Sequence, residues 1–326
     1  MKIRDVDIGY GVALAPMAGY TDRAMRLLCH RLGADYTVTE MVSAKAVVFG
    51  DKKTSALARI LPDEGKVGLQ IFGSDPDVMA EAAARLSYPE LGVQPSAIDI
   101  NMGCPVKKIF SNGDGSALMK NPPLIEKIVD RVVRATPLPV TVKIRAGVDN
   151  SNINAVECAL RAEAGGASAI CIHGRTTAQM YGGKADRKII EKVKNSLQIP
   201  LFANGDITNP DEAISMFSDT GADGIMIGRA AVGNPFLFGQ IKAKLLGEPY
   251  TEPTLAERIS LSLTQLSLAI EDKGERIAVP ESRKQIALYL KNFRGAASVR
   301  AAVNSATTFS EIRDALLSLE ASEDSV

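Results

Sequence analysis

Residues 168–174 read SAICIHG, a short apolar run that ends in a histidine and a glycine. Comparable runs recur along the chain at intervals of roughly 25–40 residues, which is a typical spacing of βα units. The other runs are VALAP (12–16), DYTVTEM (35–41), VGLQIF (67–72), AIDIN (97–101), VTVKIR (140–145), PLFANG (200–205) and DGIMIG (223–228). They are continuous rather than alternating, as expected for parallel strands that are covered on both faces.

Eight βα units predict a (β/α)8 TIM barrel over roughly residues 10–240. A doubly wound open sheet is the alternative, but it normally carries GxGxxG after its first strand, and this chain has none there. Asp75-Pro76, Asn121-Pro122 and Asn209-Pro210 each place a capping residue before a proline, which indicates that a helix begins there.

The pattern changes near residue 246, beyond which no strand-like run follows. Amphipathic spacing predicts helices at 255–270, 282–293 and 310–319. We therefore predict a catalytic barrel at residues 1–245 and a small all-helical domain at residues 246–326, with a frayed acidic end, ASEDSV.

The composition favours a globular protein in a reducing compartment. The 326 residues include 38 basic and 38 acidic side chains, so a nucleic-acid partner would need a local basic surface. The cysteines form no CxxC pair and no metal-ligand spacing, so we expect no metal site and no disulfide framework. The first residues lack the apolar core of a signal peptide, and no long apolar window occurs. We expect a cytoplasmic protein without a membrane segment, and no stable protein partner is evident.

Polar groups end nearly every predicted strand, and strand ends converge on one mouth of a barrel. Two of the turns that follow, NGDI (204–207) and GRAAVGNP (228–235), are of the kind that binds phosphate through backbone N–H groups. Gly205 and Gly228 would permit close approach, and Arg229 would add a charge partner; alternatively, the glycines only close turns.

A phosphorylated planar cofactor fits these positions, and FMN is our prediction. Gln70 and Asn101 can pair with the imide edge of its ring. Lys143 can stabilise the anionic reduced flavin, or it forms a structural salt bridge with Asp99 or Glu40.

Cys104 lies in a turn between Gly103 and Pro105 at the predicted mouth, and Lys107-Lys108 follow. Its thiol could be a nucleophile, an acid or a bystander. Cys29, Cys158 and Cys171 fall within predicted helices or strands, where we expect them to be packing residues.

Several motifs together resemble the tRNA-dihydrouridine synthase family, most closely its bacterial B-type branch. They are PMAGYTD (16–22), LQIFG (69–73), DINMGCP (99–105), VKIRAG (142–147), IHGRT (172–176), NGDI (204–207), GRAAVGNPF (228–236) and YLKNFRGAASVR (289–300). Each motif is weak alone, but their common order over nearly the whole chain is specific.

The resemblance implies an FMN-dependent enzyme that reduces the C5=C6 bond of selected uridines in tRNA, with NADPH reducing the flavin. It implies that Asn101 faces both flavin and base, and that Cys104 protonates C5 after hydride reaches C6 from the flavin. A thiol with a pKa of roughly 8.5 stays mostly protonated at neutral pH, as that role requires. The residues that would hold FMN are Pro16, Met17, Ala18, Gln70, Asn101, Lys143, His173, Asn204, Gly205, Asp206, Gly228 and Arg229.

The helical domain should supply the grip on tRNA phosphates, because a base inside a folded tRNA must be extruded to reach a barrel mouth. The stretch 282–300 contains basic residues and no acid. The predicted substrate contacts are Asn101, Arg175, Lys107, Arg283, Lys284, Lys291 and Arg294. An ordinary solvated helix face is the alternative.

Three positions depart from the family pattern. Phe236 stands where tryptophan is usual, and Arg187 where tryptophan is common; we expect both to be packing changes. Gln285 replaces a frequent histidine on the predicted RNA face, which leaves the choice of uridine open.

Two other functions remain as alternatives. One is an FMN enzyme that acts on a free pyrimidine, like a dihydroorotate dehydrogenase, although such an enzyme has no need of a basic helical domain. The other is a non-catalytic tRNA-binding flavoprotein.

Overall fold

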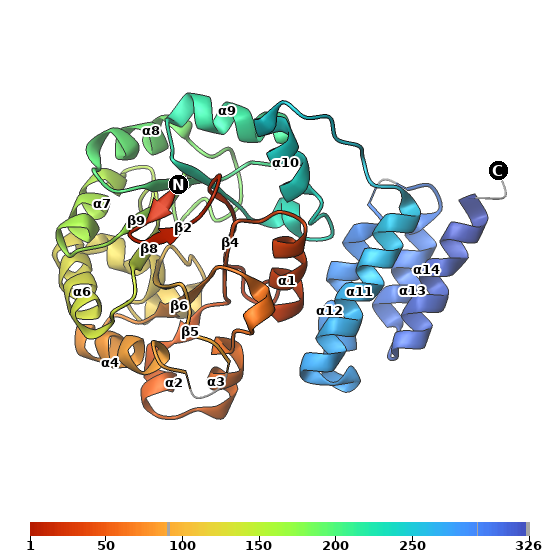
Figure 1. The fold of residues 1–326 in the computed structure, drawn as a ribbon. Coiled ribbons are helices and arrows are strands. Elements are labelled where there is room, and N and C mark those ends of the chain that lie inside the picture. The colour runs from red at the N-terminus through yellow and green to blue at the C-terminus, as the bar shows by residue number, and fades with distance from the viewer. Residues whose placement is uncertain (90–91, 292, 324–326) are drawn as a thin grey trace.

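The computed structural model describes residues 1–89, 92–291 and 293–323. Within these ranges, eight parallel strands close into a barrel, because β3 pairs with both β4 and β11 and β4 pairs with β6 (Figure 1). The barrel strands are β3 (Val12–Leu14), β4 (Tyr36–Val38), β6 (Val67–Phe72), β7 (Ala97–Met102), β8 (Val140–Arg145), β9 (Ala169–His173), β10 (Leu201–Asn204) and β11 (Gly224–Ile227). The predicted (β/α)8 barrel is confirmed, and each barrel strand falls on a predicted run.

Sequence reasoning missed the shortest strands. β5 (Val42–Ser43) adds to one side of β6, and β1 (Lys2–Ile3) pairs with β2 (Val6–Asp7) in an antiparallel hairpin. Strands of two residues are too short to show a periodic pattern.

The N-terminal hairpin closes one end of the barrel. Ile3 and Ile8 are buried against Tyr36, Phe202 and Met226, which come from β4, β10 and β11. The rings of Tyr36 and Phe202 stack with centroids 6.2 Å apart. The hairpin lies across the barrel centre in Figure 1. Because Tyr36 begins β4 and Phe202 lies early in β10, this plug fills the amino ends of the strands and leaves the carboxyl ends for a site.

Helices surround the barrel (Figure 1). Asp75, Asn121 and Asn209 each cap a helix by accepting hydrogen bonds from backbone N–H groups, as their position before proline predicts. The surrounding helices are α1 (Arg23–Arg31), α2 (Ala44–Val48), α3 (Lys52–Ala58), α4 (Pro76–Leu86), α5 (Lys107–Ser111), α6 (Pro122–Ala135), α7 (Ala155–Ala164), α8 (Arg187–Ser196), α9 (Pro210–Thr220) and α10 (Leu237–Leu246). Short 3₁₀ helices are η1 (Pro62–Glu64), η2 (Gly115–Lys120) and η3 (Arg229–Ala231).

The C-terminal part is helical and lies beside the barrel (Figure 1). It comprises α11 (Leu255–Lys273), α12 (Glu275–Tyr289), α13 (Ala296–Ser305) and α14 (Phe309–Glu323). Its own apolar core includes Leu266, Ile286 and Leu316. Of the predicted frayed acidic end, ASEDSV (321–326), residues 321–323 belong to α14, and residues 324–326 lie outside the described residues, as does residue 292 within the motif at 289–300.

The predicted helix at 282–293 was wrong in both bounds. α12 begins at Glu275 and includes Pro280 in its second turn, which a sequence pattern reads as a break. It ends at Tyr289, and Gly295, with a φ of 75°, leads into α13, which the sequence pattern did not predict.

The two parts meet through small side chains. Ala24 of α1, Ala269 of α11 and Ala278 of α12 are buried together, and their size lets the helices approach closely. Beside them, Lys273 Nζ lies 2.7 Å from an Asp22 carboxylate oxygen and 3.0 Å from one of Glu281.

Gln285 belongs to this junction, and its predicted place on an RNA-facing surface was wrong. The side chain is buried; its Oε1 accepts a hydrogen bond from Gln265 at 2.8 Å, and its Nε2 donates to the carbonyl of Gly19 at 3.5 Å. Because Gln285 lies on the inner side of α12, it contacts the barrel and not solvent.

A buried ion pair fastens α1 to η1. Arg26 Nε donates to Glu64 Oε2 at 2.8 Å, and both side chains are almost fully excluded from solvent. Arg26 Nη1 also donates to the carbonyl of Thr21 at 2.9 Å, and Glu64 Oε1 accepts from the N–H of Leu61 at 2.8 Å. Each charge is therefore paired and hydrogen-bonded, as burial requires.

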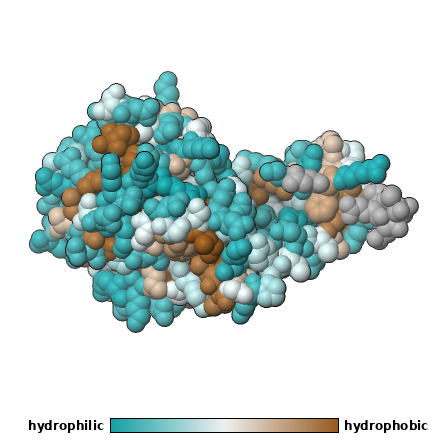
Figure 2. Space-filling model, turned by 90° about the horizontal axis from the view of Figure 1, so that it is seen from above, coloured by the Kyte–Doolittle hydropathy of each residue, from teal (hydrophilic) through white to brown (hydrophobic). Residues whose placement is uncertain are grey.

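Figure 2 shows a face that is mainly hydrophilic, with its hydrophobic residues in separate small groups. Of the helices in the described ranges, none combines the length and the apolar character needed to cross a bilayer.

Candidate active site

The polar residues that end the barrel strands come together at the carboxyl mouth. Lys143 of β8 donates from Nζ to Oδ1 of Asn204 on β10 at 3.1 Å. Asn204 Nδ2 donates in turn to the carbonyl of Met226. Pro16, Met17 and Ala18 follow β3, and Met17 Sδ lies 3.8 Å from the place that a Cβ on Gly228 would occupy. The sequence prediction that these strand ends converge is thus supported by contacts between side chains and backbone of different strands.

The hydrogen bond of Lys143 with Asn204 also bears on the alternative that Lys143 forms a structural salt bridge with Asp99 or Glu40. Its hydrogen-bond partner is the amide of Asn204, whereas Glu40 accepts from the N–H of Gly19 at 2.6 Å. Asp99 is held by hydroxyl and amide donors instead. The structure therefore does not show the structural salt bridge that we considered for Lys143.

A chain of hydrogen bonds runs from the barrel interior to the turn that carries the cysteine. Asp99 accepts from Thr141 Oγ1 at 2.5 Å and from Gln70 Nε2 at 2.6 Å. Gln70 Oε1 accepts from Asn101 Nδ2 at 2.9 Å. Asn101 Oδ1 then accepts from the backbone N–H groups of Gly103, at 3.2 Å, and Cys104, at 2.9 Å. We call this series the amide relay.

Burial raises the pKa of Asp99 to about 6, despite its hydrogen bonds from Thr141 and Gln70 and the nearby charge of Lys143. After the relay bonds, one N–H on each of the Gln70 and Asn101 amides is left for a ligand. These two donors suit the carbonyl oxygens of a flavin pyrimidine ring.

Cys104 is held in a well-defined turn. Its carbonyl accepts from Ser116 Oγ at 2.8 Å, and Arg145 Nε donates to the carbonyl of Gly103 at 2.7 Å. The thiol is partly buried, and that burial raises its pKa more than the N–H of Val106 and the charge of Arg145 lower it. The thiol is therefore protonated at neutral pH and can act as an acid. The other cysteines are buried, as predicted.

His173, Arg175 and Asp206 form a second cluster. Arg175 Nη2 donates to both carboxylate oxygens of Asp206, at 2.7 and 2.9 Å, and Arg175 Nη1 lies 3.2 Å from His173 Nε2. Burial and then the surrounding positive charges lower the pKa of His173 to about 2, so the imidazole is neutral. Because arginine can only donate, Nε2 is the acceptor and the ring proton lies on Nδ1.

Arg175, one of the predicted substrate contacts, has a buried side chain. The guanidinium is buried and also donates to the carbonyls of Gly182 and Gly183. Partial burial raises the pKa of Asp206, but the N–H of Ala185 and the guanidinium of Arg175 outweigh this and lower it below its usual range. Arg175 and Asp206 thus shape the loop after β9.

The turns after β10 and β11 have the features of a phosphate site. Gly205 has a φ of 129°, and a Cβ there would lie 2.6 Å from that of Ala185, so only glycine fits. In the part of the chain that the structure describes, the N–H groups of Gly205, Gly228 and Arg229 donate to no other residue. The exposed Arg229 guanidinium adds positive charge beside them.

Tyr181 is a site residue that sequence reasoning missed. It is 51% exposed, and its ring faces two guanidinium groups, that of Arg229 at 5.0 Å and that of Arg145 at 5.9 Å. Arg145 is the last residue of β8, so its place at a strand end indicates from the sequence that it lies near the site. Tyr181 lies in an irregular loop, where no periodic pattern points to it.

Comparison with known proteins decides the family. The family described as dihydrouridine synthase (Dus) matches residues 13–324. The chain belongs to the dihydrouridine synthase family. A protein named tRNA-dihydrouridine synthase B from Pseudomonas aeruginosa is 44% identical over 293 residues, which cover 89% of this chain and 87% of the relative. A probable tRNA-dihydrouridine synthase from Rickettsia conorii is 40% identical, with 93% and 91% covered. The predicted family is confirmed.

Solved structures show the same barrel fold at low identity. Morphinone reductase has a TM-score of 0.55 and 12% identity, and the match covers 79% of this chain and 91% of that one. Histamine dehydrogenase from Rhizobium sp. 4-9 has a TM-score of 0.56 and 13% identity, with 82% and 51% covered.

In this dihydrouridine synthase, the helical part contacts the loop after β3. Lys284 Nζ lies 5.2 Å from the centroid of the Tyr20 ring, next to the contacts of Gln285 with Gly19 and of Lys273 with Asp22. Of the other basic residues predicted to contact substrate, Lys107, Lys291 and Arg294 are exposed and Arg283 is partly buried.

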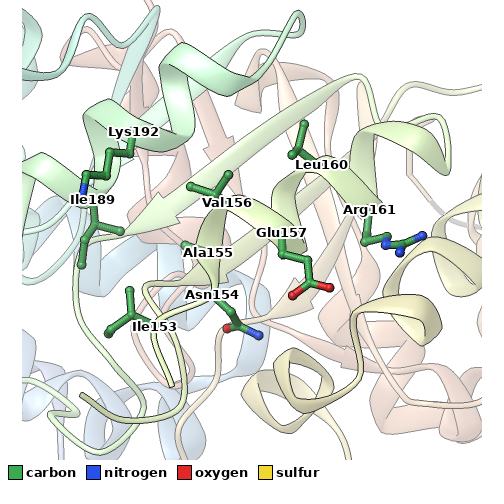
Figure 3. Close-up of a pocket in the computed structure, with 9 residues that line it drawn as sticks. All are labelled: Ile153, Asn154, Ala155, Val156, Glu157, Leu160, Arg161, Ile189 and Lys192. Atoms are coloured by element: carbon green, nitrogen blue, oxygen red, sulfur yellow. The ribbon is translucent and has the colours of Figure 1, made fainter. Parts of the chain in front are cut away.

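A separate hollow lies on the outer wall of this dihydrouridine synthase barrel, between α7 and α8. It has a volume of about 650 Å³, and its lining includes Ile153, Glu157, Leu160, Arg161 and Lys192 (Figure 3). It contains none of the strand-end residues described above, so it is not part of the mouth.

Arg187 and Phe236, the two positions where the family usually has tryptophan, have packing contacts. Arg187 donates to Asp219 at 2.5 Å and thereby ties α8 to α9, and the Phe236 ring lies 5.9 Å from the Arg258 guanidinium. Both contacts fit the predicted packing changes.

Proposed function

We propose that this chain is a flavin-dependent oxidoreductase that reduces the C5=C6 bond of uridines in tRNA to 5,6-dihydrouridine. The observation that carries the proposal is Cys104, a protonated thiol held by the amide relay in the mouth of a dihydrouridine synthase barrel. The names of the 40–44% identical relatives favour the same substrate.

FMN is the flavin that fits the donor groups best. Gly205, Gly228 and Arg229 would bind its single phosphate, with Asp206 and Arg175 shaping the loop beside it. Gln70 and Asn101 would face the pyrimidine edge of the ring, near Lys143, His173 and Asn204; Pro16, Met17 and Ala18 would line its remaining side. When bound and reduced, the flavin supplies the hydride that C6 of uracil receives.

The chain's own residues supply the proton and hold the proton donor in place. Hydride arrival at C6 leaves negative charge toward C5, which an acid on the opposite face must neutralise by protonation. The Cys104 thiol carries that proton, and Asn101 holds the turn at the required place. The neutral His173 can donate from Nδ1 without adding positive charge.

The helical part provides the grip on tRNA. We propose that residues 1–245 form the catalytic barrel and residues 246–326 the tRNA-recognition domain, with Arg283, Lys284, Lys291 and Arg294 contacting phosphates and Lys107 assisting at the mouth. The target base is extruded into the barrel. We further propose NADPH as the reductant, and a cytoplasmic location, where tRNA is abundant.

A comparison of three candidate substrates tests the function. The protein should convert uridine to dihydrouridine in unmodified tRNA, as measured by mass spectrometry of tRNA digests, and should leave free uracil and dihydroorotate unchanged. Consumption of either small molecule without tRNA turnover would establish the free-pyrimidine alternative instead.

Replacing Arg229 with alanine is expected to weaken FMN binding by about tenfold or more, because a hydrogen bond to a charged group contributes about 1.5–3 kcal/mol. Flavin absorbance that co-elutes with protein in gel filtration measures retention. Arg187→Ala is the control, since that arginine pairs with Asp219 outside the mouth. Equal retention in both variants would remove Arg229 from the phosphate site.

Replacing Arg283 and Lys284 together with alanine should weaken tRNA binding and reduce the slope of log Kd against log salt by about 2, or about 1 per phosphate contact. Filter binding over a salt series measures the slope. Arg131→Ala with Arg134→Ala on α6 removes the same charge from the barrel wall. An identical slope change in both double variants would show a general charge effect rather than a specific surface.

A further inference from the structure

We infer that Arg258 is a positioning residue for tRNA binding, because it holds the α12–α13 connection (residues 290–295), which carries Lys291 and Arg294, in a fixed place beside the barrel. The inference rests on the proposed grip of these two residues on tRNA phosphates. Its first test requires no RNA, so its outcome is separate from that of the proposed function.

Arg258 joins two aromatic rings that come from distant parts of the chain. It lies in the first turn of α11, and its side chain is 14% exposed. Its guanidinium carbon lies 5.9 Å from the centroid of the Phe236 ring, in the turn after β11, and 5.9 Å from that of the Phe293 ring, in the α12–α13 connection. A cation over an aromatic face is attracted more strongly when it is shielded from water. The guanidinium therefore links the barrel to the connection.

The two rings are the main partners of this guanidinium. Its Nη1 lies 3.5 Å from Oδ1 of Asn234, and its Nη2 lies 4.0 Å from a carboxylate oxygen of Glu252. Its Nε is buried and has no hydrogen-bond partner within the ranges that the structure describes. Replacement of Arg258 should therefore act on Phe236 and Phe293 rather than on a close ion pair.

The backbone of the α12–α13 connection is held by long hydrogen bonds. The N–H of Lys291 donates to the carbonyl of Leu288 at 3.2 Å, and that of Phe293 to the carbonyl of Leu290 at 3.5 Å. Arg300 Nη1 also donates to the carbonyl of Leu290, at 3.3 Å. The ring of Phe293 packs against the apolar core of the helical part, and it is the side chain through which the connection is anchored.

The barrel meets the end of α12 in a close backbone contact. Gly233 has a φ of 72°, and a Cβ there would lie 2.6 Å from the carbonyl carbon of Leu288. The connection continues from this point. It is thus fixed to the turn after β11 twice, by the approach of Gly233 and by Phe236 through Arg258. Because the same turn begins in the proposed phosphate site, the connection keeps a set distance from the mouth.

Lys291 and Arg294 lie on either side of Phe293 in the sequence. Both are exposed, and neither forms an ion pair with another described residue. Ordering a long basic side chain at an interface lowers affinity, and a segment that is already in place before binding reduces this cost. Arg258 thereby raises the affinity for tRNA without contacting the RNA.

The first experiment measures amide hydrogen exchange by NMR in the full-length protein, saturated with FMN and free of RNA. Arg258→Met keeps an unbranched side chain and removes the charge. It should speed exchange of the Lys291 and Phe293 amides by about tenfold, the effect of losing two partly shielded cation–π contacts. Exchange in β8 and α14 should stay within about twofold. An unchanged rate at the connection, or an equal acceleration throughout the helical part, would overturn the inference.

The second experiment is a double-mutant cycle in tRNA affinity, measured by filter binding. Arg258→Met should raise Kd by about fivefold, and Lys291→Ala combined with Arg294→Ala should raise it further. Adding Arg258→Met to that pair should change Kd by less than about twofold, because the order of the connection no longer matters without its basic side chains. Additive losses would show that Arg258 contacts RNA itself and would overturn the inference. If the unmodified protein bound no tRNA, the proposed function would be refuted, and the exchange rates would separately decide whether Arg258 holds the connection.

Two further variants keep the test decisive. Arg313→Met removes an exposed arginine of α14 that pairs with Asp314, and it should change neither Kd nor exchange at the connection by more than about twofold. An effect as large as that of Arg258→Met would show a general charge effect and would overturn the inference. Phe293→Leu keeps the guanidinium and removes one ring, so it should speed exchange about as much as Arg258→Met does. An unchanged rate in Phe293→Leu would refute the role of the ring even if Arg258→Met folds poorly.

Discussion

Replacing Cys104 with alanine is expected to lower dihydrouridine formation by about 100- to 10,000-fold, the usual contribution of a positioned general acid. The hydrogen bonds with Asn101 and Ser116 that hold the turn use the backbone of Cys104 and not its sulfur. Flavin retention and tRNA affinity should therefore stay within about twofold of the unmodified protein. Single-turnover formation of dihydrouridine, read by mass spectrometry of tRNA, measures the loss.

The pH dependence gives an independent check. An acid must be protonated to act, so turnover should fall as pH rises through the pKa of the Cys104 thiol, which burial places above its usual value. Cys104→Ser is the matched control, because a hydroxyl keeps its proton throughout this range, and it should abolish the alkaline decline. Undiminished turnover in Cys104→Ala would remove the thiol from the reaction.

Replacing Glu64 with alanine is expected to lower the free energy of unfolding by about 3–5 kcal/mol, because it leaves the buried Arg26 guanidinium without its counter-charge. The substitution also frees the N–H of Leu61, which donates to Glu64. Urea unfolding should show a lower midpoint with an unchanged slope.

Glu126→Ala supplies the comparison for this loss. Glu126 pairs with Arg161 at 2.8 Å on the barrel surface, where both side chains are substantially exposed. Its removal should cost less than about 1 kcal/mol. Similar losses in the two variants would mean that burial does not determine the contribution of the Arg26–Glu64 pair.

Much of the barrel was predictable because its strands are covered on both faces. Continuous apolar runs such as 140–145 are long enough to stand out, and each proline after Asn or Asp at 75–76, 121–122 and 209–210 does begin a helix. The hairpin of β1 and β2 and the helix α13 were not predictable. The hairpin is too short for a pattern, and α13 follows a glycine whose left-handed conformation only the structure reveals.

The site was predictable in its strand-end residues and less so in their partners. Asn101, Lys143 and Asn204 could be placed because they lie at or near the carboxyl ends of strands of one barrel. The buried contacts of Arg175 and Gln285 depend on loops and helices that pack back on the mouth, which spacing along the chain does not encode. Gln285 therefore gave the clearest difference between expectation and structure.

The contacts of α11 and α12 with Gly19, Tyr20 and Asp22 limit how this enzyme could be re-engineered. A chimera that exchanged only the C-terminal bundle, in order to direct reduction to another uridine, would remove three contacts that support a segment at the barrel mouth. The transplanted helices would have to bring their own residues 17–24, so that both sides of this contact come from the same protein.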